Sequence, residues 1–318
     1  MDSETPKTSA ITVLGLGPMG QALAVTFAAA GHSVTVWSRT PGKASHLSGP
    51  GPGPGPGPGP GPVGEAVPVR EAVSVTEAVL ASDVVVACLI DNDAMRRSLE
   101  GVEFGRRPLV NLTSGDPAQA REMAAWAASR GIAYLPGAIL TPTPMIGTPA
   151  GTVLLSGDPA IHAATAPILS ALGGRIVYLG PDPARASAFD VALLDLFATA
   201  TNGLLHAFAL AGAEGIAPAE FAAFASGIGG LLPEMAARFA AQLETGDFPG
   251  SRSTIASAAS GIRHVTAAAR AHGLDTGMLD AASVTIDRAV AQGHGSDGLG
   301  RLATILRLEV KPGQKRQK

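Results

Sequence analysis

The sequence contains very little cysteine. Of its 318 residues only Cys88 is a cysteine, so an intrachain disulfide is excluded. A lone thiol suits a reducing compartment, and we expect a cytoplasmic protein. Cys88 lies inside the apolar run DVVVACLI (83–90), which favours a buried, unreactive thiol over a nucleophile.

A large excess of charge of either sign is also lacking. Charged residues make up 15% of the chain and the net charge is −3. No Lys/Arg stripe interrupts the folded region, and the basic segment KPGQKRQK (311–318) is typical of a solvated tail, so nucleic acid is not an expected partner.

Several catalytic and targeting patterns are missing. The sequence has no His/Cys cluster with metal-ligand spacing and no Gly-x-Ser-x-Gly motif, which excludes the usual metal site and the serine hydrolase elbow. His264, His272 and His294 are expected to be structural. The segment MDSETPKTSA lacks the features of a signal peptide, and we find no uncharged stretch of membrane-spanning length and apolarity, so no membrane partner is expected.

Apolar residues are abundant, at 46%, and their pattern divides the chain into two domains. Over residues 1–180, short apolar runs alternate with Ala-rich stretches, which predicts a mostly parallel doubly wound sheet, that is, an α/β Rossmann domain. The expected strands are AITVLG, HSVTVW, EAVPV, DVVVACLI, PLVNL, GIAYL, TVLLSG and RIVYLG. Residues 181–318 read as an all-α C-terminal domain, entered by a long inter-domain helix from Pro183 to about Gly212, roughly 45 Å long.

A Gly-Pro repeat occupies residues 49–62, between the second and third expected strands. Half of its residues lack an N–H donor and none has a side chain that can pack, so it can join neither a helix nor a sheet. We interpret it as an extended low-complexity insertion; a docking motif is the alternative.

The first expected strand runs into a glycine motif that predicts a dinucleotide site. Gly15-x-Gly17-x-x-Gly20 follows the strand and opens a helix. Gly15 permits a tight turn, Gly17 lets a pyrophosphate approach, and Gly20 lets helix and strand pack closely. The N–H groups at the helix start would hold the phosphates. The predicted cofactor contacts also include Leu16, Pro18 and Met19, of which Pro18 has no N–H to donate.

The lack of an acidic residue after the second expected strand indicates which dinucleotide binds. An NAD site places an Asp or Glu at the end of the second strand, but residues 21–64 contain neither. The segment WSRTPGK stands there instead, and it contains Ser38, Arg39, Thr40 and Lys43. Two cations and two hydroxyls suit a 2′-phosphate, which predicts NADP(H).

Two further strand ends supply candidates for the cofactor side of the site. Asn111 and Thr113 follow one strand, in NLTSGD, and their alternative role is to form a turn. Leu89 and Ile90 follow another strand, and we expect them to pack against the ribose side of the cofactor.

Asp190 lies in the long helix among Ala, Leu, Val and Phe. It is too deep to cap the helix, because Asp182 and Pro183 already read as N-cap and first residue. Ala186, Leu193, Leu194 and Phe197 share its face at helical spacing, a setting that should raise its pKa. Two roles stay open: a catalytic carboxylate, or one partner of an ion pair across the domain junction. Asp195 lies roughly 140° further around the helix and is expected to be structural.

Five sets of segments together resemble the NADPH-dependent imine reductases, relatives of the β-hydroxyacid dehydrogenases and of 6-phosphogluconate dehydrogenase-like proteins. They are GLGPMG with AAAGHSVTVWSRTPGK, VNLTSGDP, PGAILTPTPMIGTPAG, GPDPARASAFDVALL and DRAVAQGHGSD. The resemblance runs almost end to end, apart from the Gly-Pro tract. The family more often has Trp-Asn-Arg where this chain has Trp-Ser-Arg, but Ser38 can still donate to a phosphate.

The resemblance assigns Asp190 a role. Hydroxyacid dehydrogenases have a catalytic Lys at the matching position and an Asn four residues on, where this chain has Asp190 and Leu194. In many imine reductases an Asp or Tyr stands there as the proton donor or as an anchor for the iminium. The resemblance further implies NADPH as cofactor and a homodimer with exchanged helical domains, each cleft being walled by both subunits.

The sequence therefore predicts an enzyme that uses NADPH to reduce cyclic imines to amines. A carboxylate favours a cationic electrophile, and an imine accepts hydride better as its iminium. Whether the enzyme also joins ketones to amines stays open. The alternatives are an NADP-dependent β-hydroxyacid dehydrogenase and a non-catalytic NADP(H)-binding regulator.

Overall fold

The structure is a computed structural model and describes residues 8–45, 47 and 69–306. The Gly-Pro tract (49–62) and the basic segment (311–318) lie outside the described residues, so their interpretations stay predictions.

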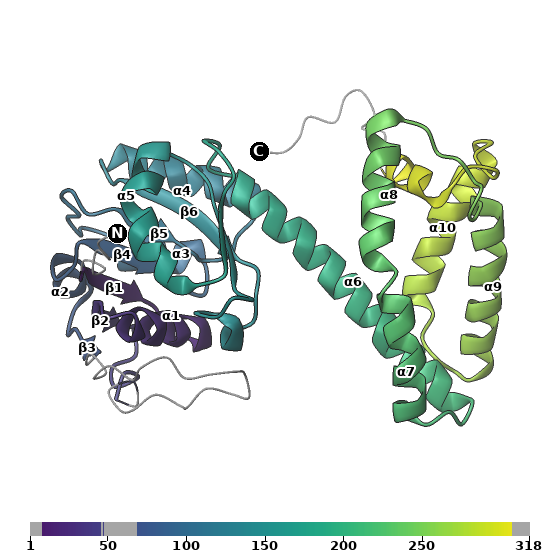
Figure 1. The fold of residues 1–318 in the computed structure, drawn as a ribbon, viewed down its shortest axis with the longest axis horizontal. Coiled ribbons are helices and arrows are strands. Elements are labelled where there is room, and N and C mark those ends of the chain that lie inside the picture. Colours follow the sequence, from purple (N-terminus) through teal and green to yellow (C-terminus); the bar gives the residue numbers. More distant parts are fainter. Residues whose placement is uncertain (1–7, 46, 48–68, 307–318) are drawn as a thin grey trace, which may run out of the picture. The chain divides into compact units, whose positions relative to one another are not determined.

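An eight-stranded sheet forms the core of the N-terminal part (Figure 1). Its strand order is β3-β2-β1-β4-β5-β6-β7-β8, and all neighbours are parallel except β6 and β7. This order confirms the mostly parallel, doubly wound sheet. The strands are β1 (Ala10–Leu14), β2 (Ser33–Trp37), β3 (Arg70–Glu71), β4 (Val84–Ala87), β5 (Leu109–Asn111), β6 (Tyr134–Ile139), β7 (Thr152–Leu155) and β8 (Arg175–Tyr178).

The third strand is shifted from its expected place. The run EAVPV (65–69) predicts it, but the strand covers Arg70–Glu71, while Val69 precedes it and residues 65–68 are not described.

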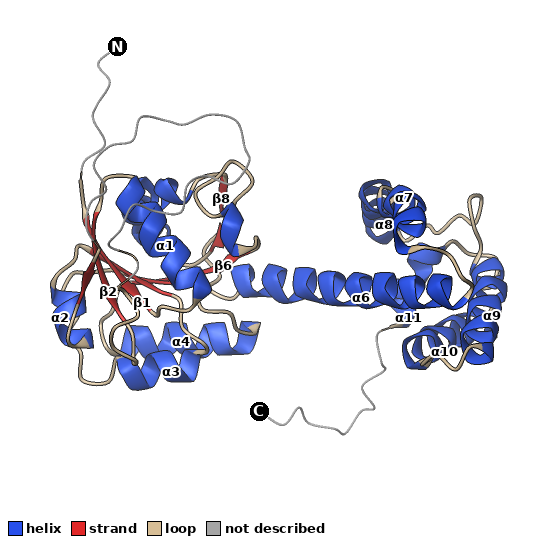
Figure 2. Ribbon diagram, turned by 90° about the horizontal axis from the view of Figure 1, so that it is seen from below, coloured by secondary structure: helices blue, strands red, loops and turns tan. Residues whose placement is uncertain are grey.

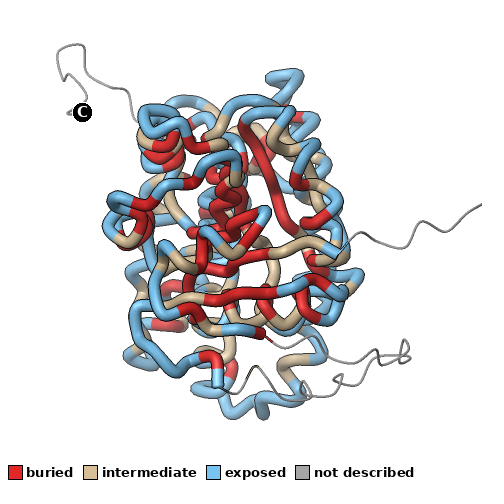
Figure 3. Tube along the Cα trace, turned by 90° about the vertical axis from the view of Figure 1, so that its left-hand side faces the viewer, coloured by how far each residue is buried: buried red, intermediate tan, exposed pale blue. Residues whose placement is uncertain are grey.

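Helices cover both faces of the sheet (Figure 2). Successive strand residues point to opposite faces, so Val13 and Val86 join the core under one helix layer, and Leu14 and Val85 join the core under the other. Figure 3 colours the buried residues of the chain red. The first layer contains α1 (Pro18–Ala29) and α5 (Pro159–Leu169), and the second contains α2 (Val75–Leu80), α3 (Asn92–Ser98) and α4 (Pro117–Ser129).

The chain after β8 is helical as far as it is described. Breaks were expected at the Gly-rich segments AGAEGIAP, ETGDFPGS, AHGLDTG and AQGHGSDG, and helices do end there. One further break, at Gly230–Leu231, separates α7 from α8. The helices are α6 (Arg185–Ala213), α7 (Pro218–Gly229), α8 (Leu232–Thr245), α9 (Ile255–Ala271), α10 (Gly277–Ala291) and α11 (Leu302–Ile305); short 3₁₀ turns are η1 (Thr143–Met145), η2 (Ser170–Leu172) and η3 (Leu299–Arg301).

The long helix α6 begins at Arg185, two residues later than expected. Asp182 still caps it, because its Oδ1 accepts from the N–H of Ala184 at 3.0 Å. The hydroxyl of Ser156, just after β7, accepts from the N–H of Ala186 and donates to Pro183 O. These bonds fix the start of α6 to the sheet domain.

The two compact units of the chain divide inside α6, between Phe197 and Ala198. The sequence predicted the domain boundary at residue 180. The first turns of α6 belong to the sheet unit because Ala184, Ala186 and Asp190 are buried. In the second unit, α9, α10 and α11 share a small core of Ile255, Ala259, Ile286, Ala289 and Ile305.

The sequence was expected to contain no apolar stretch of membrane-spanning length. By length and composition alone, however, α6 is long and apolar enough to cross a membrane. The charged residues of α6, Arg185, Asp190 and Asp195, lie in its first turns, and residues 196–213 contain no Asp, Glu, Lys or Arg. Helix α6 is the one such helix in the described chain, and a core helix of a folded protein would pass the same test.

Candidate functional site at the carboxyl ends of the strands

Backbone hydrogen bonds bring the predicted cofactor segments to one edge of the sheet. Gly15 N donates to Trp37 O at 2.9 Å, and Cys88 N donates to Leu14 O at 2.8 Å. Because β1, β2, β4 and β5 are parallel, their carboxyl ends share this edge, which is where such sheets bind nucleotides.

The three glycines of the turn after β1 have different surroundings. Gly15 has φ +101°, and a Cβ there would lie 2.2 Å from Cys88 O. A Cβ on Gly20 would lie 1.9 Å from Gly15 O, so a glycine is needed for α1 to approach β1. A Cβ on Gly17 would meet nothing within 4 Å. Packing therefore requires Gly15 and Gly20, whereas Gly17 leaves open space for a ligand.

The start of α1 is suited to an anion. No described side chain caps it, and its first turn contains no acid. Gly17 and Pro18 are exposed, whereas Leu16 is buried and Met19 packs partly against the core. Leu16 and Met19 thus pack their side chains against the protein, and a contact of their backbone with a phosphate stays a prediction.

The loop after β2 carries two exposed cations. Arg39 and Lys43 are exposed, and no acid of the described chain forms an ion pair with either. Ser38 Oγ donates to Thr40 O at 2.6 Å, which fixes the bend between them. Unpaired cations beside hydroxyl groups fit the 2′-phosphate that the sequence predicts here.

Asn111, at the end of β5, uses its side chain within the protein. Its Nδ2 donates to Asn92 Oδ1 at 3.0 Å and to the Tyr134 hydroxyl at 2.8 Å, and its Oδ1 accepts from Thr113 N at 2.9 Å. Thr113 Oγ1 accepts from Leu89 N at 3.1 Å. These contacts give Asn111 and Thr113 the task of holding the loops after β4 and β5 together, and a direct contact with the cofactor stays a prediction.

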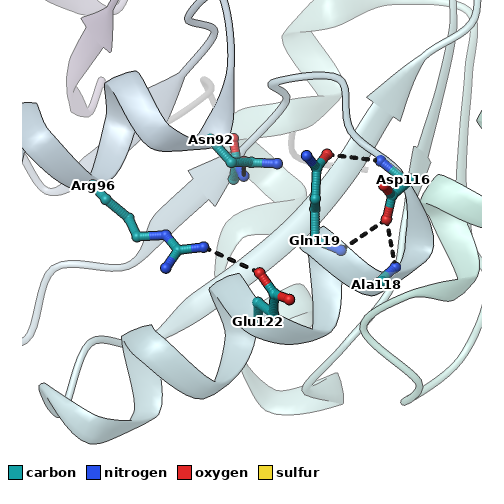
Figure 4. Close-up of polar contacts among 7 residues, drawn as sticks. Asn92, Arg96, Asp116, Ala118, Gln119 and Glu122 are labelled. Atoms are coloured by element: carbon teal, nitrogen blue, oxygen red, sulfur yellow. Dashed lines mark hydrogen bonds and ion pairs between the residues drawn. The ribbon is translucent and has the colours of Figure 1, made fainter. Parts of the chain in front are cut away.

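The loop after β5 is further fixed where it enters α4 (Figure 4). Asp116 and Gln119 form a capping box, in which Asp116 Oδ1 accepts from Gln119 N and Gln119 Oε1 accepts from Asp116 N. A Cβ on Gly115 would lie 2.5 Å from Asn92 Nδ2 and 2.9 Å from Gln119 Oε1. The loop therefore has one closely packed conformation.

The segment after β4 combines a partly buried thiol and an exposed aliphatic residue. Burial raises the pKa of the Cys88 thiol to about 11, which agrees with an unreactive cysteine. Leu89 is half-buried, while Ile90 is 83% exposed. An isoleucine so exposed at this edge fits the predicted contact with the cofactor.

Asp190 is 5% exposed, and among the described residues no group donates a hydrogen bond or forms an ion pair with its carboxylate. Burial raises the pKa of Asp190, as the sequence predicts. Both roles of Asp190, a catalytic carboxylate or one partner of an ion pair across the domain junction, stay predictions.

The face of α6 that carries Asp190 is buried at its start and exposed further along. Ala186 is buried, but Leu193, Leu194 and Phe197 on the same face are exposed, Phe197 by 69%. The apolar face beyond Asp190 is therefore uncovered in a single chain.

The histidines behave as structural residues where contacts are present. His272 Nε2 lies 2.8 Å from Glu214 Oε1, and His294 Nδ1 lies 3.1 Å from Asp297 Oδ2. The described residues contain no cluster of three or more potential metal ligands.

Sequence reasoning missed Asn92, Tyr134, Ser156 and Glu71. Tyr134 is buried, and burial raises its pKa to about 12. Glu71 Oε1 accepts from Gly42 N in the loop after β2, at 3.0 Å. No local motif marks these four residues, because their partners are distant in sequence; for Asn92 the position after a buried strand was the one available signal.

Comparisons with known proteins match both halves of the chain. Residues 10–180 match the NAD binding domain of 6-phosphogluconate dehydrogenase, and residues 182–308 match the NADPH-dependent reductive aminase-like C-terminal domain. An NADPH-dependent reductive aminase from Aspergillus oryzae is 30% identical over 304 residues, which cover 92% of this chain and 95% of the relative.

Solved structures agree with these matches. The imine reductase from Myxococcus stipitatus in complex with NADP⁺ has a TM-score of 0.84 and 30% identity, covering 94% of this chain and 100% of that one. The reductive aminase from Aspergillus terreus in complex with NADPH and ethyl levulinate has a TM-score of 0.84 and 30% identity, covering 95% of this chain and 100% of that one.

Proposed function

The chain belongs to the family of NADPH-dependent imine reductases and reductive aminases, and from this premise we propose that it reduces cyclic imines to amines with Asp190 as its catalytic residue. It is an NADPH-dependent oxidoreductase acting on C=N bonds. The observation that carries the proposal is the buried carboxylate of Asp190, which pairs with no described residue. The resemblance places it at the position where hydroxyacid dehydrogenases have a lysine.

The cofactor fits the sheet edge described above. The open space at Gly17 and the uncapped start of α1 would hold the pyrophosphate, and Arg39 and Lys43 would hold the 2′-phosphate. Leu89 and Ile90 would pack beside the ribose and nicotinamide. When bound, NADPH supplies the hydride that adds to the imine carbon.

Asp190 contributes charge and a proton site. A carboxylate in a poorly solvated position attracts an iminium more strongly than it would in water. As the C=N electron pair moves to nitrogen, that nitrogen keeps or takes up one proton. The raised pKa of Asp190 lets its carboxylic acid form donate that proton, because the acid form persists at higher pH than for an exposed aspartate.

We further propose that the protein works as a homodimer with exchanged helical domains. Large apolar side chains are exposed along α6 and α7, among them Phe189, Leu193, Phe197, Leu205, Phe224 and Ile228. A surface of this kind needs a partner, and two α6 helices can cover one another. A lipid bilayer is the less favoured cover, since α6 also contains Asp190, Asp195 and His206.

A cytoplasmic location is proposed on two grounds. The enzyme consumes a reducing cofactor that this compartment maintains, and its one thiol has no cysteine in the chain with which to pair.

The absorbance of NADPH tests the function. We expect consumption of NADPH with a panel of small cyclic imines such as 1-pyrrolines. We expect no formation of NADPH from NADP⁺ and 3-hydroxyisobutyrate. A second arm supplies a ketone and an amine to measure reductive amination. Turnover of the hydroxy acid alone would support the β-hydroxyacid dehydrogenase alternative. Tight NADPH binding without consumption would support a regulator.

A further inference from the structure

The loop after β2 depends on a contact that comes from another strand. Within residues 38–45, Ser38 Oγ donates to Thr40 O, and Ser45 Oγ donates to Gly42 O at 3.0 Å. Both bonds are local. The bond from Gly42 N to Glu71 Oε1, at 3.0 Å, is the one hydrogen bond in the described chain that ties this loop to a different element.

The position of Glu71 follows from the sheet register. Glu71 is the second residue of β3 and pairs with Val36 of β2, and Ala72 N donates to Val36 O. Its side chain therefore lies beside the point where β2 ends and the loop begins. Gly42, with φ +80°, turns its N–H toward this carboxylate in a conformation that L-residues rarely adopt.

The charges in the loop make this contact unexpected. A carboxylate near a phosphate site repels the phosphate. A carboxylate that pairs with the cations of the site would also neutralise the charge that binds the phosphate. Glu71 forms no ion pair with Arg39 or Lys43 within the described residues. Its described hydrogen bond is instead made with the backbone, at the residue directly before Lys43.

We propose that Glu71 is a positioning residue for NADP(H) selectivity: its bond to Gly42 N holds the loop in the conformation that presents Arg39 and Lys43 to the 2′-phosphate. The proposal rests on the assignment of NADPH as cofactor. It concerns the adenosine end of the cofactor, so it does not depend on which imine the enzyme reduces.

The test compares the binding of NADPH with the binding of NADH. NADH lacks the 2′-phosphate, so a loosened cation loop weakens NADPH binding and leaves NADH binding nearly unchanged. Damage to the sheet weakens both. The dissociation constants of NADPH and NADH, measured by nicotinamide fluorescence without substrate, separate these cases and remain interpretable if imine reduction itself fails.

Three variants are compared with the wild type. Glu71→Ala removes the acceptor, and we expect NADPH to bind about 3- to 10-fold more weakly, with NADH within about 2-fold. Glu71→Gln keeps an acceptor oxygen, and we expect near wild-type values. Glu100→Ala makes the same charge change at an exposed residue after α3 and serves as the control.

The proposal is overturned if Glu71→Ala leaves NADPH binding unchanged or strengthens it, or if it weakens NADPH and NADH alike. It is also overturned if Glu71→Gln loses as much as Glu71→Ala, because charge and not the hydrogen bond would then decide. A loss in Glu100→Ala equal to that in Glu71→Ala would assign the effect to net charge.

Discussion

At the scale of single residues, burial and charge oppose each other at Asp190. An ionised carboxylate without a partner is costly in a poorly solvated position, and substitutions that leave one there usually destabilise a protein. Asp190 remains in the fold although no described residue pairs with it. A group kept at a cost to stability suits a site that binds a cation in the reaction.

The raised pKa of Asp190 predicts a pH-dependent stability. The folded protein holds this proton more tightly than the unfolded chain, so ionisation lowers the free energy of unfolding as the pH rises from the unfolded to the folded pKa. We expect Asp190→Asn to melt at a higher temperature than the wild type at about pH 7, with the difference closing toward about pH 4. A difference that is the same at both pH values would contradict the assigned cause.

At the scale of elements, the glycine turn combines folding and binding in one motif. Gly20 is needed because a Cβ would lie 1.9 Å from Gly15 O, whereas Gly17 has open space and an ordinary φ of −69°. The two glycines therefore differ in what an added methyl group would disturb.

Two alanine variants check this difference. We expect Gly17→Ala to keep the melting temperature of the wild type and to lose about 10-fold or more in NADPH affinity, because the methyl group fills the phosphate space. Gly20→Ala should lose about 3 kcal/mol or more in free energy of unfolding, since backbone atoms must move. Urea unfolding and NADPH fluorescence measure the two effects. Equal behaviour of the variants would refute the assigned roles.

The sequence predicts elements well where the signal is local. Continuous apolar runs indicated the strands, and the glycine segments indicated most helix ends. The short edge strand β3 was misplaced because one strand neighbour gives it a weak apolar pattern. Asn92 and Glu71 escaped notice because their partners lie 19 and 29 residues away, and only the folded sheet brings them together.

At the scale of the whole molecule, the apolar face of α6 lacks a cover in a single chain. Helical spacing places Leu193, Leu194 and Phe197 on the face of Asp190, and these three side chains are exposed. Periodicity identifies an apolar face without showing what covers it. A second subunit is the cover that we propose.

Light scattering coupled to size-exclusion chromatography tests this dimer. We expect twice the chain mass of 31.8 kDa in the absence of detergent. Phe224, on α7, is 75% exposed, and Phe224→Asp should shift the protein to the monomer mass because a charge cannot be buried in an apolar interface. Val73→Asp, at a residue 94% exposed in the sheet unit, is the control and should stay dimeric. A wild type that elutes as a monomer, or that needs detergent, would refute the proposal.

The most direct measurement is imine turnover by Asp190→Asn, which keeps the shape of the side chain and removes its charge and its acid. The account predicts that kcat with a cyclic imine falls about 100-fold or more while the dissociation constant of NADPH stays within about 2-fold. Turnover equal to that of the wild type, with NADPH bound as tightly, would contradict the account and remove Asp190 from the reaction.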